Sequence, residues 1–161
     1  MPPRKRSRSS AAASSAAVPP AIALGGGAAF PAAVVDLWRE GALCDADVVA
    51  GGRTFRAHKL VLCAGSAYMK ARLSDGAGRW ADSAGALELA EMAASALDAA
   101  LAFLYTGACE VPGDGALLGD VVEAAAYLRI GPLQEAAEAA LVERLAPANA
   151  ISMWRDADHL S

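Results

Sequence analysis

Hydrophobic positions along the chain recur at two spacings, which separate predicted helices from predicted strands. Phe30, Val34, Leu37 and Trp38 follow one another at helical intervals, so they predict a short amphipathic helix that ends near the next glycine. Residues 45–50 instead alternate polar and apolar, which is typical of a half-buried strand. The first part of the pattern therefore predicts a helix followed by a strand.

A hairpin is predicted directly after this strand. Gly51 and Gly52 form a two-residue connection in which both backbones can adopt positive φ. The return strand then covers 53–57, and its alternation places Phe55 toward the core.

The remaining pattern is mainly helical. Ser66 is placed to cap a helix by accepting a hydrogen bond from a free backbone N–H, and Gly107 suits the end of another helix. The predicted helices cover 58–63, 67–73, 97–105, 117–128 and 132–145, with one short strand at 87–89. This order predicts an α+β fold, in which a small, mainly antiparallel sheet is flanked by a cluster of short helices.

Composition divides the chain into a tail and a domain. Hydrophobic residues make up 55% of the 161 residues, but 42 of all residues are alanine, so the large core side chains are few. Residues 1–29 consist mostly of Arg, Ser, Ala, Pro and Gly, and we expect them to be disordered. Ordered structure is expected from Phe30, and the domain is expected to extend to residue 145.

Charge is distributed unevenly between the two parts. Arg4, Lys5, Arg6 and Arg8 lie in the tail, which leaves ten basic residues against eighteen acidic ones in the rest of the chain. The tail resembles a nuclear-localisation patch, and a solvated segment without a targeting role or an organelle transit peptide are the alternatives. The acidic domain is not expected to bind nucleic acid, which requires a basic surface.

Membrane and disulfide chemistry are not expected. The longest apolar run, 21–35, is interrupted by three glycines and a proline and is shorter than the roughly 20 residues a bilayer crossing requires. Cys44, Cys63 and Cys109 are odd in number and widely spaced, so reduced, buried thiols in a cytoplasmic or nuclear protein are expected.

The segment 55–73 concentrates reactive residue types, yet no catalytic arrangement fits it. Ser66 lacks the two flanking glycines of a hydrolase elbow, and Cys63 lies on a different side of a helix from His58. Cys44, His58 and Cys63 lack a fourth zinc ligand at a suitable spacing. We therefore expect neither an enzyme nor a metal or other cofactor.

The order of these residues resembles the BTB/POZ domain family. The resemblance begins with LWREGALCDADVVAGGRTFRAHKLVLCAGSAYMKARL at 37–73 and continues through ALELAEM at 86–92 and LAFLYTG at 101–107. VVEAAAYLRIGPLQEAAEAALVERL at 121–145 is similar to the closing helix pair of the family. The resemblance implies protein–protein interaction rather than catalysis.

A homodimer is the first partner that the resemblance implies. In the family the first helix packs on the second protomer, so Phe30, Val34, Leu37 and Trp38 are the candidate interface; packing of the same stripe within one chain is the alternative. Asp45 and Lys59 match positions of a charged pocket in transcription-factor relatives, and a structural salt bridge is the alternative for this pair.

The second implied partner is the N-terminal region of cullin-3. Family members that act as adaptors dock a hydrophobic-x-Glu motif from the loop before the middle strand, and the nearest match here is Trp80-Ala81-Asp82. Asp82 stands where the family has Glu and is one methylene shorter. A Trp80 that covers the local core is the alternative.

The end of the chain, 146–161, resembles the start of the BACK domain of Kelch-like adaptors. Ile151, Trp154, Ala157 and Leu160 form an apolar stripe near the last residue. We expect a truncated chain, and folding of this segment back onto the last helix of the domain is the alternative. The sequence thus predicts a BTB adaptor that links cullin-3 to an unknown ubiquitination substrate. A nuclear transcription or chromatin regulator that recruits corepressors is the alternative.

Overall fold

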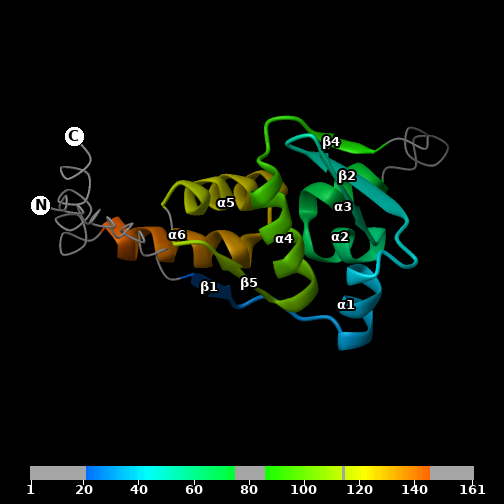
Figure 1. Cartoon of the computed structure of the whole chain (residues 1–161), viewed down its shortest axis with the longest axis horizontal. Helices are drawn as coiled ribbons and strands as arrows, with labels where there is room; N and C mark the ends of the chain where they lie inside the picture. Colours follow the sequence, from blue (N-terminus) through cyan, green and yellow to red (C-terminus); the bar gives the residue numbers. More distant parts are fainter. Residues whose placement is uncertain (1–20, 75–85, 114, 146–161) are drawn as a thin grey trace, which may run out of the picture.

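The computed structural model describes residues 21–74, 86–113 and 115–145 (Figure 1). Helices and strands alternate in the α+β arrangement that the hydrophobic pattern predicts. In chain order they are β1 (Ile22–Gly25), α1 (Ala32–Arg39), β2 (Ala46–Ala50), β3 (Arg53–Ala57), α2 (Lys59–Gly65), α3 (Ala67–Ser74), β4 (Leu87–Leu89), α4 (Ala94–Thr106), β5 (Ala108–Val111), α5 (Gly115–Leu128) and α6 (Gly131–Leu145). In this part of the chain no helix is long and apolar enough to cross a bilayer.

The described strands form two small sheets. One has the order β3-β2-β4, in which β2 pairs with β3 antiparallel and with β4 parallel. The hairpin between β2 and β3 turns through Gly51 and Gly52 at φ of 52° and 74°, as the sequence predicts, and Phe55 is buried in the core.

The second sheet corrects the predicted start of the domain. Strand β1 lies inside the segment 1–29 that we expected to be disordered, and it pairs antiparallel with β5, another strand that the pattern did not predict. Leu24 faces Cys109 in this pair, and both side chains are buried. Two short segments that are separately too weak to read as strands satisfy each other's backbone groups.

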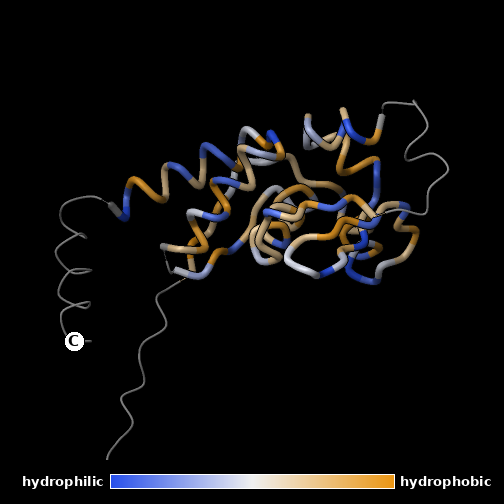
Figure 2. Tube along the Cα trace, turned by 90° about the horizontal axis from the view of Figure 1, so that it is seen from above, coloured by the Kyte–Doolittle hydropathy of each residue, from blue (hydrophilic) through white to orange (hydrophobic). Residues whose placement is uncertain are grey.

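Helix α4 is the centre of the core. In Figure 1, α5 and α6 lie on one side of it, and α2, α3 and the three-stranded sheet lie on the other. Figure 2 shows hydrophobic and hydrophilic residues alternating along the outer helix α6, as expected for a helix with one solvated face. The α4 side chains that are buried are Ala96, Leu97, Ala100, Leu101, Phe103, Leu104 and Tyr105.

Ser66 joins two helices to the core. Its Oγ accepts a hydrogen bond from the Met69 amide at 3.0 Å, which caps α3 as predicted, and donates to the Leu128 carbonyl at 2.5 Å. The residue is buried, so one hydroxyl satisfies a helix start and the last turn of α5 together.

Candidate protein-interaction surface

Helix α1 carries three of the four predicted interface residues, whereas Phe30, which the spacing placed on the same helix, lies two residues before its start. Phe30, Val34, Leu37 and Trp38, here called the α1 face, are each partly exposed, whereas Val35 is buried. Val35 was not part of the predicted stripe, although it lies one position along the same helix. The α1 face is therefore held at the surface by its neighbour rather than sunk into the core.

Part of the α1 face also packs within the chain. The Trp38 ring stacks on Tyr105 with centroids 4.3 Å apart and planes within 4°. The Phe30 ring is tilted against the same tyrosine at 6.5 Å, and the Phe30 amide donates to the Tyr105 carbonyl at 2.9 Å. Thus α4 holds both ends of the α1 face in place while some of its apolar surface stays accessible to solvent.

Tyr105 links the α1 face to His58, which belongs to the segment 55–73 that concentrates reactive residue types. Its hydroxyl accepts a hydrogen bond from the His58 backbone N–H at 2.9 Å and lies 2.8 Å from His58 Nδ1. Burial raises the pKa of Tyr105 to about 12, and the hydrogen bond from His58 offsets part of the increase.

The second ring nitrogen of His58 is also engaged. The Ala42 carbonyl lies 3.0 Å from Nε2 and can only accept, so Nε2 of the neutral ring carries the proton and Nδ1 accepts a hydrogen bond from the Tyr105 hydroxyl. Cys44 Sγ lies 4.0 Å from Nε2, and burial is the largest effect that raises the pKa of this thiol. The arrangement orients His58 as a structural connection between the segment after α1, the start of α2, and α4.

Asp45 and Lys59 are adjacent, but their contact differs from the expected side-chain salt bridge. Asp45 Oδ1 accepts a hydrogen bond from the Lys59 backbone N–H at 2.7 Å. Lys59 is the first residue of α2, so a carboxylate from fourteen positions earlier satisfies one of the free amides of that helix. Asp45 thus stabilises the first turn of α2 through a backbone amide. A charged pocket formed by Asp45 and Lys59 stays a prediction.

Two exposed leucines lie in the segments that His58 and Asp45 anchor, and they were missed by the sequence analysis. Leu43 is 79% exposed and has a φ of 57°, and Leu60 is 75% exposed on α2. Each lies within two residues of a group anchored by His58 or Asp45. The signal for Leu60 was present, because Leu60, Val61 and Leu62 are consecutive on a helix and cannot all face the core.

The other predicted positions lie outside the described residues. These are Trp80 and Asp82 of the cullin-docking motif, the basic residues Arg4, Lys5, Arg6 and Arg8, and the BACK-like segment 146–161. Among the residues that the structure does describe, no three His, Cys, Asp or Glu side chains are grouped as metal ligands.

Comparison with known proteins agrees with this geometry. The BTB/POZ domain family matches residues 34–145. The chain is 36% identical over 104 residues to the transcription activator GAGA of Drosophila melanogaster, covering 65% of this chain and 17% of that protein. It is 31% identical over 119 residues to human Kelch-like protein 38, covering 74% and 20%. Mouse Kelch-like protein 40 is 33% identical over 121 residues, covering 74% and 18%.

A solved structure shows the same fold. The BTB domain of zebrafish PATZ1 superposes with a TM-score of 0.58 at 22% sequence identity, covering 69% of this chain and 86% of that domain. The chain spans about a fifth or less of the length of the curated relatives it matches.

Proposed function

The chain belongs to the BTB/POZ family of protein-interaction modules, and on that premise we propose that it forms a homodimer and acts as a substrate adaptor of a cullin-3 ubiquitin ligase. The substrate would be selected by residues beyond the BTB domain. The observation that carries the proposal is the half-buried α1 face, because a rigid apolar surface is held ready for a second protein.

The dimer is supported by the way in which α1 is fixed. Trp38 and Phe30 are packed on Tyr105, so little conformational entropy remains to be lost when a second copy covers them. Leu43 and Leu60 add exposed apolar area from neighbouring segments. In an isologous dimer, each of these side chains would be buried in both protomers, because the same surface of each copy forms the interface.

The adaptor role is supported by two lines of argument. Two of the relatives are Kelch-like proteins, and their alignments cover about three quarters of this chain. In addition, the segment 75–85 of the sequence contains Trp80 two residues before Asp82, which is the nearest match to the docking motif of cullin-binding family members. A tryptophan presented by a loop is a typical binding hot spot.

Calorimetric titration of the full chain with the N-terminal region of cullin-3 tests the adaptor role. We expect saturable binding that Trp80→Ala abolishes, whereas Asp82→Glu, which restores the longer acid of the family, strengthens it. Trp154→Ala is the matched control because it removes the same side chain outside the loop. A folded, dimeric chain that gives no heat of binding would refute cullin docking.

A nuclear role in transcription is the second candidate, and the GAGA relative favours it. In this proposal the basic residues Arg4, Lys5, Arg6 and Arg8 direct nuclear import, and the pocket around Asp45 and Lys59 takes a corepressor. Binding of a corepressor fragment that Lys59→Ala weakens, together with no binding to cullin-3, would favour this candidate over the first.

A further inference from the structure

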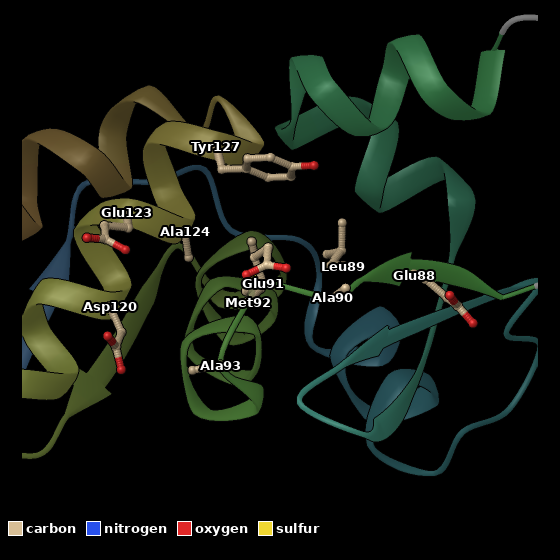
Figure 3. Close-up of a pocket in the computed structure, with 10 residues that line it drawn as sticks. All are labelled: Glu88, Leu89, Ala90, Glu91, Met92, Ala93, Asp120, Glu123, Ala124 and Tyr127. Atoms are coloured by element: carbon tan, nitrogen blue, oxygen red, sulfur yellow. The ribbon is translucent and has the colours of Figure 1, made fainter.

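An acidic groove lies away from the α1 face, between the turn after β4 and helix α5. It encloses about 440 Å³ (Figure 3). Figure 3 shows Asp120 and Glu123 projecting from α5, with Glu91 from the turn and Glu88 further out along β4. Among the residues that the structure describes, the lining contains four carboxylates and no basic side chain.

The groove combines this charge with an apolar floor. Leu89, Met92 and Ala124 line it and are buried, so its base is fixed by core packing. Tyr127 forms one wall and is 54% exposed, which presents an aromatic ring to an incoming group. An aromatic wall beside carboxylates is suited to guanidinium groups, which bind carboxylates through paired hydrogen bonds and stack on rings.

The four carboxylates are not neutralised within the described part of the chain. There, none of Glu88, Glu91, Asp120 and Glu123 has a side-chain hydrogen bond or an ion pair. Since like charges repel, a cluster of this kind lowers its energy when a cation occupies the groove. The geometry therefore favours a ligand with several positive charges over a metal ion, because the floor offers carbon rather than oxygen.

The chain itself contains a segment of the required chemistry. Residues 4–8 carry Arg4, Lys5, Arg6 and Arg8, and residues 1–29 contain no acid at all. We propose that this basic segment of the same chain binds in the groove between the β4–α4 turn and α5, with arginine side chains against Glu91, Glu123 and Tyr127.

The length of the connecting chain permits this contact. Twelve residues lie between Arg8 and Ala21, the first described residue, so thirteen Cα–Cα steps of about 3.3–3.6 Å reach roughly 45 Å when extended. A domain of this size has a radius of gyration of only about 13 Å, so the extended segment is about three times as long as this radius and can follow much of the domain surface. Because the segment is covalently attached, its effective concentration at the groove is in the millimolar range, about that of other short flexible linkers.

The first test uses the full chain and NMR of backbone amides. Replacing Arg4, Lys5, Arg6 and Arg8 together by alanine is expected to shift resonances of 88–93 and 120–127 and to leave those of α1 unchanged. Raising the salt concentration in the wild type should produce the same shifts, since an exposed ionic contact is screened. Unchanged groove resonances in the tail variant would overturn the proposal.

The second test measures the contact directly. A fluorescent peptide of residues 1–10 is titrated into the full chain with the alanine-substituted tail, in which the groove is free. We expect saturable binding that Glu91→Lys with Glu123→Lys weakens at least about tenfold, as reversal of two contacting charges requires. The matched control, Glu110→Lys with Glu135→Lys, makes the same charge change at exposed positions outside the groove.

The controls distinguish binding of the basic segment of the same chain from a general charge effect and from binding of a second copy. Equal loss of affinity in both double variants would mean a general charge effect and would overturn the proposed site. Groove shifts that depend on protein concentration would mean that the tail of a second copy is the occupant, which also contradicts the proposal. Neither result depends on dimerisation or on cullin-3, because the groove residues are not part of the α1 face or of the segment 75–85.

Discussion

Trp38 lies face to face with Tyr105, with ring centroids 4.3 Å apart and planes within 4°. Tyr105 is fully buried and belongs to α4, whereas Trp38 belongs to the partly exposed α1 face. The same tyrosine bonds His58 through its hydroxyl. The position of the α1 face is thus coupled to the hydrogen bonds of Tyr105. Substitutions at Tyr105 and at the surface test this coupling.

Removing the Tyr105 hydroxyl should destabilise the fold while the ring stack persists. Tyr105→Phe leaves the His58 amide and Nδ1 without their partner, and we expect a loss of about 1–3 kcal/mol in the free energy of unfolding. Urea denaturation measures it. Tyr127→Phe makes the same chemical change in an exposed hydroxyl pair with Tyr68 and should change stability by less than about 0.5 kcal/mol. Equal effects of the two changes would contradict the structural role of the buried hydroxyl.

The proposed dimer predicts that a charge at Leu60 blocks self-association. Leu60→Glu places a carboxylate at an exposed position of α2 that the proposed dimer would cover, so the monomer should stay folded while the dimer is weakened. Sedimentation equilibrium should show a dimer for the wild type and a monomer for this variant. Val142→Glu, at a residue of α6 that is 69% exposed, is the control and should remain dimeric. A monomeric wild type at tens of micromolar (about the working range of the method) would exclude the interface.

The buried Ser66 hydroxyl should be needed for stability because it serves two elements. Ser66→Ala removes the α3 cap and leaves the Leu128 carbonyl without its donor, and we expect a cost of about 1–3 kcal/mol. Ser95→Ala, at an exposed position near the start of α4, is the matched control and should be close to neutral. Thermal unfolding of the two variants compares them, and a neutral Ser66→Ala would mean that water replaces the hydroxyl.

Gly107 should resist substitution more strongly than other glycines. Its φ is 73°, and a Cβ at this position would lie 2.5 Å from the Gly27 carbonyl oxygen, where α4 turns into β5. Gly107→Ala is expected to destabilise the fold by about 1–3 kcal/mol, from left-handed strain together with the clash. At Gly131 a Cβ meets no atom within 4 Å, so Gly131→Ala should cost much less. Chemical denaturation of both variants measures the difference.

Stability should fall in alkaline solution. Burial raises the pKa of Cys109 from 9.0 to about 11 and that of Tyr105 from 10.0 to about 12, so the folded state holds both protons more tightly than the unfolded state does. The resulting stabilisation is complete below pH 9 and is lost as the pH rises to 12, at up to about 2–3 kcal/mol per group.

Urea midpoints measured between pH 8 and 12 test this dependence. Cys109→Ala should flatten the curve between pH 9 and 11, and Tyr105→Phe should flatten it between 10 and 12. A wild-type midpoint that stays constant to pH 11 would show that the thiol is not shielded from water.

Much of the fold follows from the sequence because the responsible forces act between near neighbours. The positive φ of Gly51 and Gly52, the cap at Ser66 and the helix stop at Gly107 were each predicted from residues within one turn, and each is confirmed. The helical spacing also predicted α1, although it placed Phe30 on this helix and the helix begins at Ala32. These features depend on steric limits and hydrogen bonds that a segment carries with it.

Only the tertiary structure decided the contacts between distant segments. Strands β1 and β5 are each four residues long and become strands only when they pair across more than eighty positions. The bonds from Tyr105 to His58 span 47 residues, and the acidic groove joins a turn near Glu91 to α5. Such contacts depend on how the whole chain closes on its core, so local periodicity contains no signal for them.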